Sequence, residues 1–404
     1  MDGGLYRGPP RGGTDRCVTM AGVGHTRAAL AGFLLGAAGM FAVMYSTQAI
    51  LPELSREFGV SAAEAGLTVS IVILVLAAGA WVWGPLSDRW GRKKTLVLAS
   101  ALVAVPTLAS ALAPSFGVLL ACRALQGLCM PGLLTVGAPY VVEVFGPQLG
   151  GKAMGLYITA LVSGGIVGRV GIALATTAVG WRWPVGALSL LPVAGAIIMA
   201  RTLPEAPVQE NTARRWDAVR RLARNRGLQQ ATAAASALFF AFVGVFSFVT
   251  FRLEGPPVGW SQAAGGLIFL MWGLGALGPL AGTAADRAGW RRVVLAALAC
   301  GTGAVALSLP ATAITLIPAL ALLAAAMFCG VTAAQLGSAT STSADRGVAS
   351  AMYFSVYYAS GALGGYLPGL AWEHWRWTGV VVGCLAVLTA ALVLCTAHTR
   401  LLPD

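Results

Sequence analysis

Gly84-Pro85-Leu86-Ser87-Asp88-Arg89-Trp90-Gly91-Arg92-Lys93-Lys94 is a charged turn between two long apolar stretches. Its four cations surround a single acid, Asp88. The apolar run before the turn covers residues 65–83, and the run after it covers residues 95–113. Because Lys and Arg are retained on the inner side of a membrane, a basic turn between two such runs is typical of a cytoplasmic hairpin in a membrane protein.

The composition favours a membrane protein over a soluble one. Hydrophobic residues make up 57% of the 404 residues and charged residues 10%, against roughly 25% charged in a soluble domain. The net charge of +12 does not indicate a nucleic-acid partner, because the cations lie in loops beside an expected anionic lipid bilayer. The seven cysteines have no paired spacing and are expected to be apolar fillers rather than metal ligands. No cofactor is expected.

The apolar runs predict an all-α membrane protein with twelve transmembrane helices. Twenty-one Lys and Arg residues fall on the side of the two termini and four on the other side, so both termini are expected in the cytoplasm. The expected helices cover residues 28–51, 62–84, 95–113, 115–141, 152–178, 183–201, 229–251, 261–281, 292–309, 312–337, 348–371 and 375–397.

The segments outside these runs divide the chain into four parts. Residues 1–27 are rich in Gly, Pro and Arg and are expected to be a disordered tail. The first run is about twice as long as the apolar part of a signal peptide, so it is expected to remain as a helix. Residues 203–228 are expected to form a basic cytoplasmic linker between an N-terminal part, 28–202, and a C-terminal part, 229–398.

Three motifs recur at nearly one offset. The opening turn reappears 198 positions later as Gly282-x-x-x-Asp286-Arg287-x-Gly289, with Trp290 in the place of Arg92. The sequence Trp-Arg-Trp occurs at 181–183 and 375–377, and Gly-x-x-x-Gly at 164–168 and 361–365. This repetition predicts two pseudo-symmetric halves of six helices each.

The order Gly-x-x-x-Asp-Arg-x-Gly-Arg-Lys resembles the loop 2–3 motif of the major facilitator superfamily. The resemblance implies that the Asp of the motif, Asp88, lies against the start of helix 11, near residues 346–350, and that the Arg of the motif bonds an acid at the end of helix 4, here Glu143. Gly84 is expected to let two helices approach closely. The contacts would exist only when the inner side is closed and would favour the outward-facing state; the alternative is a solvated basic turn. The expected conformational gate consists of Gly84, Asp88, Arg89, Gly91, Arg92, Glu143, Asp286 and Arg287.

Arg123 lies about eight residues inside an expected helix, which places it near the middle of the membrane. An Arg at that depth is costly and is by default functional. Arg123-x-x-Gln126-Gly127 also resembles the helix-4 motif of the superfamily, which is tied to proton transfer in its antiporters. The alternative is an Arg that only bonds neighbouring helices.

Arg169 departs from the antiporter motif of helix 5, which is Gly-x-x-x-Gly-Pro followed by two glycines. Here Arg169 replaces the proline, and Ile172-Ala173 replaces the glycine pair. Gly-Arg at this point, with Trp-Arg in the next loop, resembles a bacterial branch classed with efflux permeases. Two interpretations of Arg169 remain: a functional role, and a packing role in which the side chain extends its charge to the outer surface of the membrane.

Other polar side chains are candidates to line a substrate or proton pathway between the halves. They are Tyr45, Gln48, Gln335 and Tyr357, and each could instead be an ordinary interhelical hydrogen-bonding residue. None of the fifteen acids falls in the middle of an expected span. A strongly cationic substrate is therefore disfavoured, and proton coupling would have to use rim acids such as Glu53 or Asp88, or water near Arg123.

The resulting hypothesis is a monomeric transporter of a bacterial inner membrane that exports a small organic solute, with proton coupling, by alternating access. Arg123 near mid-membrane favours neutral or weakly anionic substrates, and Arg123→Ala is expected to abolish transport while the protein is still made. An importer or uniporter of a neutral or anionic solute on the same fold is the alternative, because these motifs do not encode direction. A membrane enzyme or receptor is disfavoured, since the sequence has no nucleotide-binding Gly-rich loop, His/Cys cluster or sizeable soluble part.

Overall fold

The computed structural model describes residues 20–205, 215–256, 258–310, 312–342 and 346–400. Most of the expected tail and part of the expected linker lie outside these residues. The described backbone is helical and contains no strand. The first helix begins at Met20, eight residues before the expected start of the first run.

The elements follow most of the apolar runs, but the expected helices 115–141 and 152–178 are divided differently, because α6 ends at Cys129 and α7 continues across the boundary expected between them. Those up to residue 205 are α1 (Met20–Tyr45), the 3-10 turn η1 (Gln48–Ile50), α2 (Leu51–Phe58), α3 (Ala62–Trp90), α4 (Arg92–Leu102), α5 (Ala104–Ala111), α6 (Phe116–Cys129), α7 (Pro131–Ile166), the π-helical η2 (Val167–Gly171), α8 (Ile172–Val179), α9 (Arg182–Ala187) and α10 (Leu190–Thr202). Those from residue 215 are α11 (Arg215–Leu222), α12 (Arg226–Glu254), α13 (Gln262–Gly266), the 3-10 segment η3 (Leu267–Leu277), α14 (Gly278–Ala288), α15 (Trp290–Leu307), α16 (Ala313–Thr340) and α17 (Arg346–Arg400).

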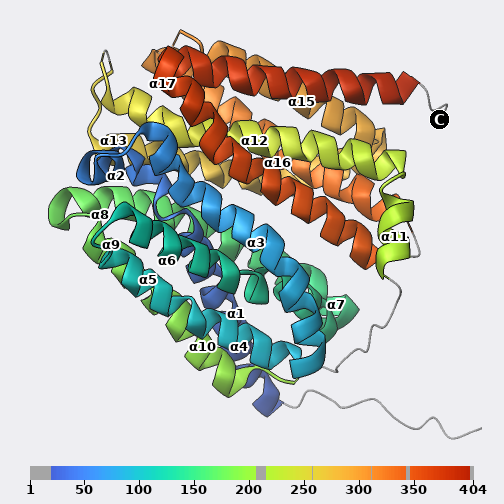
Figure 1. Ribbon diagram of the computed structural model, residues 1–404. Helices are drawn as coiled ribbons and strands as arrows, with labels where there is room; N and C mark the ends of the chain where they lie inside the picture. Colours follow the sequence, from blue (N-terminus) through green and yellow to red (C-terminus); the bar gives the residue numbers. More distant parts are fainter. Residues whose placement is uncertain (1–19, 206–214, 257, 311, 343–345, 401–404) are drawn as a thin grey trace, which may run out of the picture.

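Eleven segments of the described chain are long and apolar enough to cross a membrane. The last of them, Val348–Ala397, has 50 residues, about twice the length that one crossing needs. Its helix is interrupted at Arg376, where φ is 52°, and Figure 1 shows α17 turning back on itself. The last segment therefore supplies two crossings, and the expected all-α membrane fold with twelve crossings is confirmed.

Local sequence signals set where several helices begin. The side chain of Ser61 accepts from the backbone N–H of Glu64, and the Glu64 carboxylate accepts from the backbone N–H of Ser61, which is a capping box at the start of α3. The two charged turns hold a glycine at positive φ, Gly91 at 89° and Gly289 at 86°. Because other residues rarely adopt that conformation, each glycine ends one helix and allows the next to start at once.

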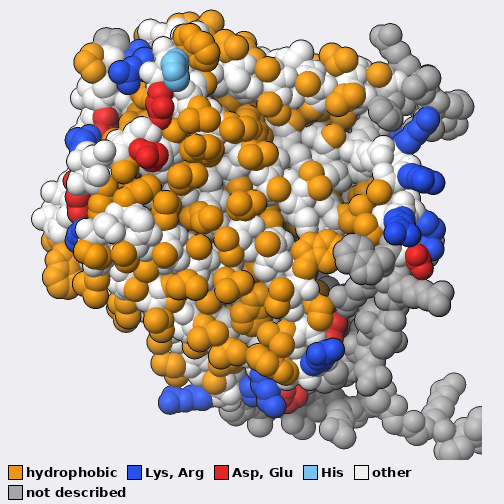
Figure 2. Space-filling model, in the orientation of Figure 1, with side chains coloured by type: hydrophobic (Ala, Val, Ile, Leu, Met, Phe, Trp, Pro, Cys, Tyr) orange, Lys and Arg blue, Asp and Glu red, His pale blue; other side chains and the backbone are white. Residues whose placement is uncertain are grey.

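The helices form two groups that lie side by side (Figure 1). The N-terminal helices α1–α10 lie in one group and the C-terminal helices α12–α17 in the other, with α3 and α17 in contact along the boundary. Hydrophobic side chains cover the middle of the visible surface, and charged ones gather toward its two ends (Figure 2). Whether the two groups are symmetric repeats stays a prediction. We refer below to the α2 end, which carries α2 and α13, and to the opposite α11 end.

Candidate functional site

The first membrane helix is broken near the α2 end. The run 28–51 was expected to be one helix, but α1 ends at Tyr45 and η1 and α2 follow after a turn. A helix end leaves carbonyl groups without partners in the helix. Here Arg123 of α6 supplies the hydrogen-bond donors for these carbonyls. It donates from Nη1 to the Val43 carbonyl at 2.8 Å and from Nη2 to the Met44 carbonyl at 2.5 Å.

The remaining donors of Arg123 are also used. Its Nε donates to the Thr68 carbonyl of α3 at 2.8 Å, and Nη1 also contacts the Gln126 side-chain oxygen at 2.6 Å. The Gln126 amide in turn donates to Thr107 and Ser110 of α5. Arg123 is only 1% exposed. These contacts hold α1, α3, α5 and α6 together, so the geometry favours the helix-bonding alternative for Arg123, and its part in a proton or substrate pathway stays a prediction.

Arg169 lies on the π-helical segment η2 of the next crossing. Such one-turn insertions release a carbonyl from the α-helical ladder, and here Arg169 Nη1 donates to the Gly165 carbonyl at 2.7 Å. The segment can lie close to α1 because a Cβ on Gly164 or Gly168 would come within 2.1 Å or 2.3 Å of the backbone oxygens of Ala38 and Ala42. The Gly-x-x-x-Gly motif thus lets the backbone that carries Arg169 pack directly against α1.

The Arg169 guanidinium is sandwiched between rings of the two helix groups. Its Cζ lies 3.8 Å from the ring centroid of Tyr45 on α1 and 3.6 Å from that of Trp272 on η3. Its Nε donates to the Gln48 side-chain oxygen at 2.6 Å, and the Gln48 amide donates to Ser247 of α12 at 3.0 Å. Arg169, Tyr45, Gln48 and Ser247 are all at most 2% exposed. A buried polar and aromatic layer therefore joins the N-terminal to the C-terminal helices.

Two donors in this layer are left over. Neither Nη2 of Arg169 nor Nε1 of Trp272 has a hydrogen-bond partner in the described part of the protein. No carboxylate of the described residues lies within ion-pairing distance of Arg169. Interaction of the cation with the two ring faces offsets part of its desolvation cost, but no described carboxylate balances the charge.

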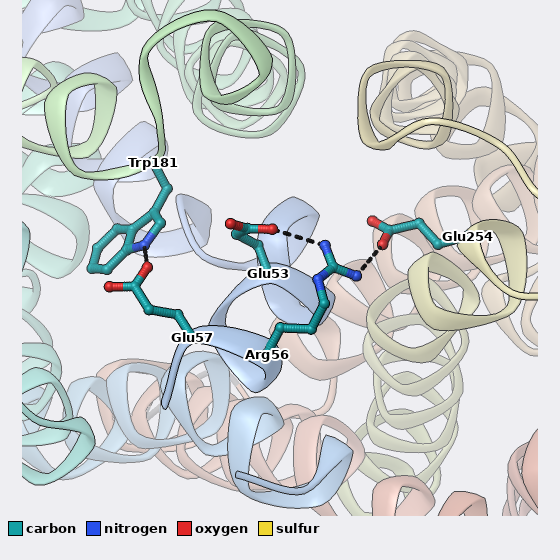
Figure 3. Close-up of polar contacts among 5 residues, drawn as sticks. All are labelled: Glu53, Arg56, Glu57, Trp181 and Glu254. Carbon is teal, nitrogen blue, oxygen red and sulfur yellow. Dashed lines mark hydrogen bonds and ion pairs between the residues drawn. The ribbon is translucent and has the colours of Figure 1, made fainter. Parts of the chain in front are cut away.

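A second layer of contacts lies at the rim of the same end (Figure 3). Arg56 of α2 bonds Glu254 at the end of α12 at 2.9 Å and Glu53 at 2.8 Å. The first of these ion pairs joins the two helix groups. Glu57 accepts from the Trp181 indole. It also forms an ion pair with Arg182 at 2.6 Å, so both contacts hold α2 against the start of α9.

Backbones of the two groups approach closely at the α2 end. A Cβ on Gly66 of α3 would come within 2.2 Å of the Gly365 carbonyl of α17, and one on Gly266 of α13 would come within 2.2 Å of the Ala173 Cβ of α8. Only glycine fits at such separations. Together with the ion pair and the buried layer, these contacts close the α2 end.

Gly84, near the α11 end, has no such neighbour. A Cβ on Gly84 would meet nothing within 4 Å, so the close helix approach expected there is wrong for this conformation. The segment expected to face Asp88 begins beside residues 343–345, which lie outside the described ones. Among the described residues, a hydrogen bond from the Trp81 indole of α3 to Ser355 of α17, at 2.8 Å, joins the groups further along α3 toward the α11 end. Within the part of the chain that the structure describes, the contacts that join the groups are thus concentrated toward the α2 end.

The motif arginine does contact Glu143, and the residue involved is Arg92. Its Nε and Nη2 donate to the two carboxylate oxygens at 2.5 Å and 2.6 Å, and both side chains are mostly buried. This two-pronged pair joins the start of α4 to α7, within the N-terminal helices. Arg89 is exposed, and the gating role of all these residues stays a prediction.

The repeated turn differs at the corresponding point. Asp286 and Arg287 are exposed, and neither forms an ion pair within the described ranges. Trp290, which stands where Arg92 does in the first turn, packs against α16, where a Cβ on Gly337 would lie 2.5 Å from its ring. In the second turn, packing of Trp290 on Gly337 therefore takes the place of the Arg92–Glu143 ion pair of the first turn.

Among the described residues, Gln335 and Tyr357 form no hydrogen bond or ring contact with Tyr45, Gln48 or Arg169. Gln335 is exposed on the stripe of α16 that includes Phe328, whose ring lies 5.8 Å from that of Trp272. Gln335 is seven residues further along, or about 10 Å, in the direction of the α11 end. Tyr357 is buried and stacks on Phe239 with 4.2 Å between ring centroids. The structure thus brings Tyr45, Gln48 and Arg169 together, with Tyr357 near enough to Tyr45 for an electrostatic interaction and Gln335 further along α16.

Sequence reasoning did not single out Trp272, Arg56 or Glu254. Trp272 lies in an apolar stretch with no polar neighbour in the sequence, so nothing indicated its contact with Arg169. The ion pair between Arg56 and Glu254 could have been predicted from the sequence. Arg56 follows the first apolar run of one half and Glu254 follows the first run of the other, so opposite charges lie on the side expected to carry few cations.

The membrane-spanning helices, the hydrophobic middle of the surface and the contacts that close the α2 end are typical of a multi-pass membrane transporter. Comparison with known proteins leads to the same class of protein. The model of the Major Facilitator Superfamily matches residues 33–365, and the chain belongs to that superfamily, as the motif predicted. The inner membrane transport protein YnfM of Escherichia coli (strain K12) is 32% identical over 381 residues, which cover 93% of this chain and 91% of YnfM. The MFS-type transporter YybF of Bacillus subtilis (strain 168) is 28% identical over 362 residues, with 88% of this chain and 89% of YybF covered.

A solved structure shares the fold. It is a bacterial homolog of the human lysosomal transporter Spinster in an inward-facing and occupied conformation, with a TM-score of 0.78 at 16% identity. The match covers 93% of this chain and 97% of that one. At this identity the likeness concerns the fold alone.

Proposed function

We propose that this transporter exports a small organic solute from a bacterial cell across the inner membrane, driven by protons, through alternating access. The observation that carries the proposal is the difference between the two ends of the bundle. Arg56–Glu254, Gln48–Ser247 and the glycine contacts join the helix groups at the α2 end, whereas Gly84 near the α11 end faces open space. A single closed end is what alternating access requires in one of its states.

The distribution of cations supports the assignment of sides. Lys and Arg gather in the loops of the α11 end and in both terminal segments, so we place that end and both termini in the cytoplasm. The conformation described here is then the inward-facing one. The ion pair and hydrogen bonds of the α2 end have to break before the solute pathway opens to the outside.

Proton coupling is proposed to use carboxylates at the rim. Glu53 and Glu254 share Arg56 at the α2 end. Protonation of either carboxylate removes an attraction across or beside the closed end, which links proton uptake from outside to opening. Rim carboxylates remain the candidates because the described spans hold Arg123 and Arg169 but no buried Asp or Glu.

Accumulation of solutes in a bacterial strain that lacks its own exporters tests direction. A toxicity screen with and without the gene first identifies compounds that respond, and a radiolabelled responder is then followed over time. Export predicts less accumulation in cells with the gene, and loss of that difference after a protonophore. Asp88→Asn serves as a matched variant that is made normally but exports more slowly. Greater accumulation with the gene would establish an importer instead.

A further inference from the structure

The two buried arginines differ in a way that bears on the ligand. Arg123 has partners for Nε, Nη1 and Nη2, all within the N-terminal helices. Arg169 keeps Nη2 free of any described partner and contacts both helix groups. Of the two cations, only Arg169 therefore has a donor to spare at the boundary where a transported solute must pass.

A movement that opens the α2 end has to uncover Arg169. Gly165 and Gln48 hold its guanidinium to the N-terminal helices by hydrogen bonds of 2.7 Å and 2.6 Å, and Tyr45 stacks on it from the same side. Trp272 belongs to the C-terminal helices and is held to Arg169 only by the ring contact. When the groups separate, the gap that opens lies between the Arg169 guanidinium and the Trp272 ring, so a solute that enters it lies between the two donors without partners.

The walls around this point are aromatic. Trp272 lies 5.1 Å from Tyr45, 5.2 Å from Phe242 and 5.8 Å from Phe328, measured between ring centroids. Phe41 is a further 5.5 Å from Tyr45. Rings prefer edge-to-face or offset contacts with other rings, so these side chains suit a flat aromatic body.

We propose that Arg169, with the indole N–H of Trp272, is the anchor for the anionic group of the transported solute, and that the solute is a small aromatic carboxylate. The proposal rests on the transport function proposed above and names its substrate class. The carboxylate supplies the counterion that Arg169 lacks and accepts from the two unpartnered donors. The aromatic body packs among the rings that line the boundary.

Thermal unfolding of the purified full-length protein in detergent tests the anchor. The probes are benzoate, salicylate and phenylacetate, with benzamide as the neutral match for benzoate and benzyltrimethylammonium as the cation. We expect at least one carboxylate to raise the unfolding midpoint by several degrees in a saturable way, and benzamide and the cation to leave it unchanged. Equal shifts by benzoate and benzamide, or no shift with any carboxylate, would overturn the proposal.

Three variants localise the effect. Arg169→Gln should abolish the carboxylate shift, whereas Arg201→Gln, which removes an exposed arginine in the last turn of α10, should keep it. Trp272→Phe retains a ring against Arg169 and removes only the N–H, so it should weaken carboxylate binding roughly tenfold or more. Trp272→Phe also remains informative if Arg169→Gln fails to fold. Unchanged carboxylate affinity in Trp272→Phe would exclude the indole from the anchor.

The result is separable from that of the transport proposal. If no carboxylate binds while the two ends of the bundle still alternate, the substrate class is wrong and the transporter mechanism stands. If carboxylates bind at Arg169 but the ends never alternate, the site stands and the mechanism is wrong.

Discussion

The guanidinium of Arg169 lies 3.6 Å from the ring centroid of Trp272, a residue more than a hundred positions away in the sequence and on the other group of helices. This contact is deeper in the bundle than the Arg56–Glu254 ion pair at the rim. It joins the two groups through a buried charge, where an aromatic partner contributes more than it does at an exposed site.

Trp272→Ala should weaken the closed α2 end. Loss of the ring contact removes about 0.5–2 kcal/mol, which raises the ratio of outward-open to closed protein roughly twofold to thirtyfold. The measurement is the rate at which a membrane-impermeant maleimide added outside the cells labels Ser247→Cys, in a variant without the native cysteines. Ser247 is fully buried in the closed form.

Trp183→Ala is the control for that measurement, because Trp183 is 78% exposed. It should label at the parental rate. A Trp272→Ala variant that also labels at the parental rate would show that the ring contact does not hold the end closed.

Glycine replacements at the two ends should act in opposite directions. Gly266→Val places a side chain where a Cβ would already be 2.2 Å from the Ala173 Cβ, so it should disfavour closure of the α2 end. Gly84→Val meets no atom within 4 Å in the present form and should instead disfavour closure of the α11 end. Proteolysis or maleimide labelling from each side of oriented vesicles distinguishes the two. The same direction of change for both variants would contradict the assignment of closed and open ends.

Separation of Arg92 from Glu143 should cost stability without changing ligand affinity. The pair is two-pronged and mostly buried, at 13% and 19% side-chain exposure, and removal of one partner of such a pair costs about 3 kcal/mol. A thermal-unfolding cycle of Arg92→Gln, Glu143→Gln and the double variant measures the coupling. Additive effects of the two single changes would mean that the pair contributes nothing beyond its separate residues.

Arg123→Ala should reduce the amount of folded protein in the membrane. The sequence alone predicts a different effect, namely loss of transport while the protein is still made. Its removal leaves the carbonyls of Val43, Met44 and Thr68 without their donor in the core, at about 1–3 kcal/mol for each buried group. Arg123→Lys should recover part of the loss. Size-exclusion chromatography of fluorescent fusions provides the measurement. Full yield of Arg123→Ala with loss of transport alone would restore the interpretation of Arg123 as part of the proton or substrate pathway.

Much of the fold could be predicted because apolar length and charged turns are local signals. Gly91 and Gly289 end helices at the turns that the repeated motif predicted. The contact of Arg92 with Glu143 followed from the family resemblance. The break in α1 was missed, although Ser46-Thr47-Gln48 and Pro52 are signals for a helix that stops.

The Arg169 layer could not be predicted in the same way. The sequence showed that Gly164 and Gly168 allow close packing, and the structure adds that α1 is the helix they face. The partner across the boundary, Trp272, depends on which end of the bundle is closed. That is a property of one conformation, and no local pattern around residue 272 encodes it.

The most direct test of the account measures both ends of the bundle in one preparation. Spin labels at Ala178 and Pro256 report on the α2 end, and labels at Trp90 and Thr340 report on the α11 end; all four residues are exposed. Double electron–electron resonance in lipid nanodiscs gives the distance distribution of each pair with and without a transported solute. The account predicts that the α2-end distance gains a longer component while the α11-end distance gains a shorter one, and that Gly266→Val enlarges both components. A single α2-end distance that never changes while the protein transports the solute would contradict it.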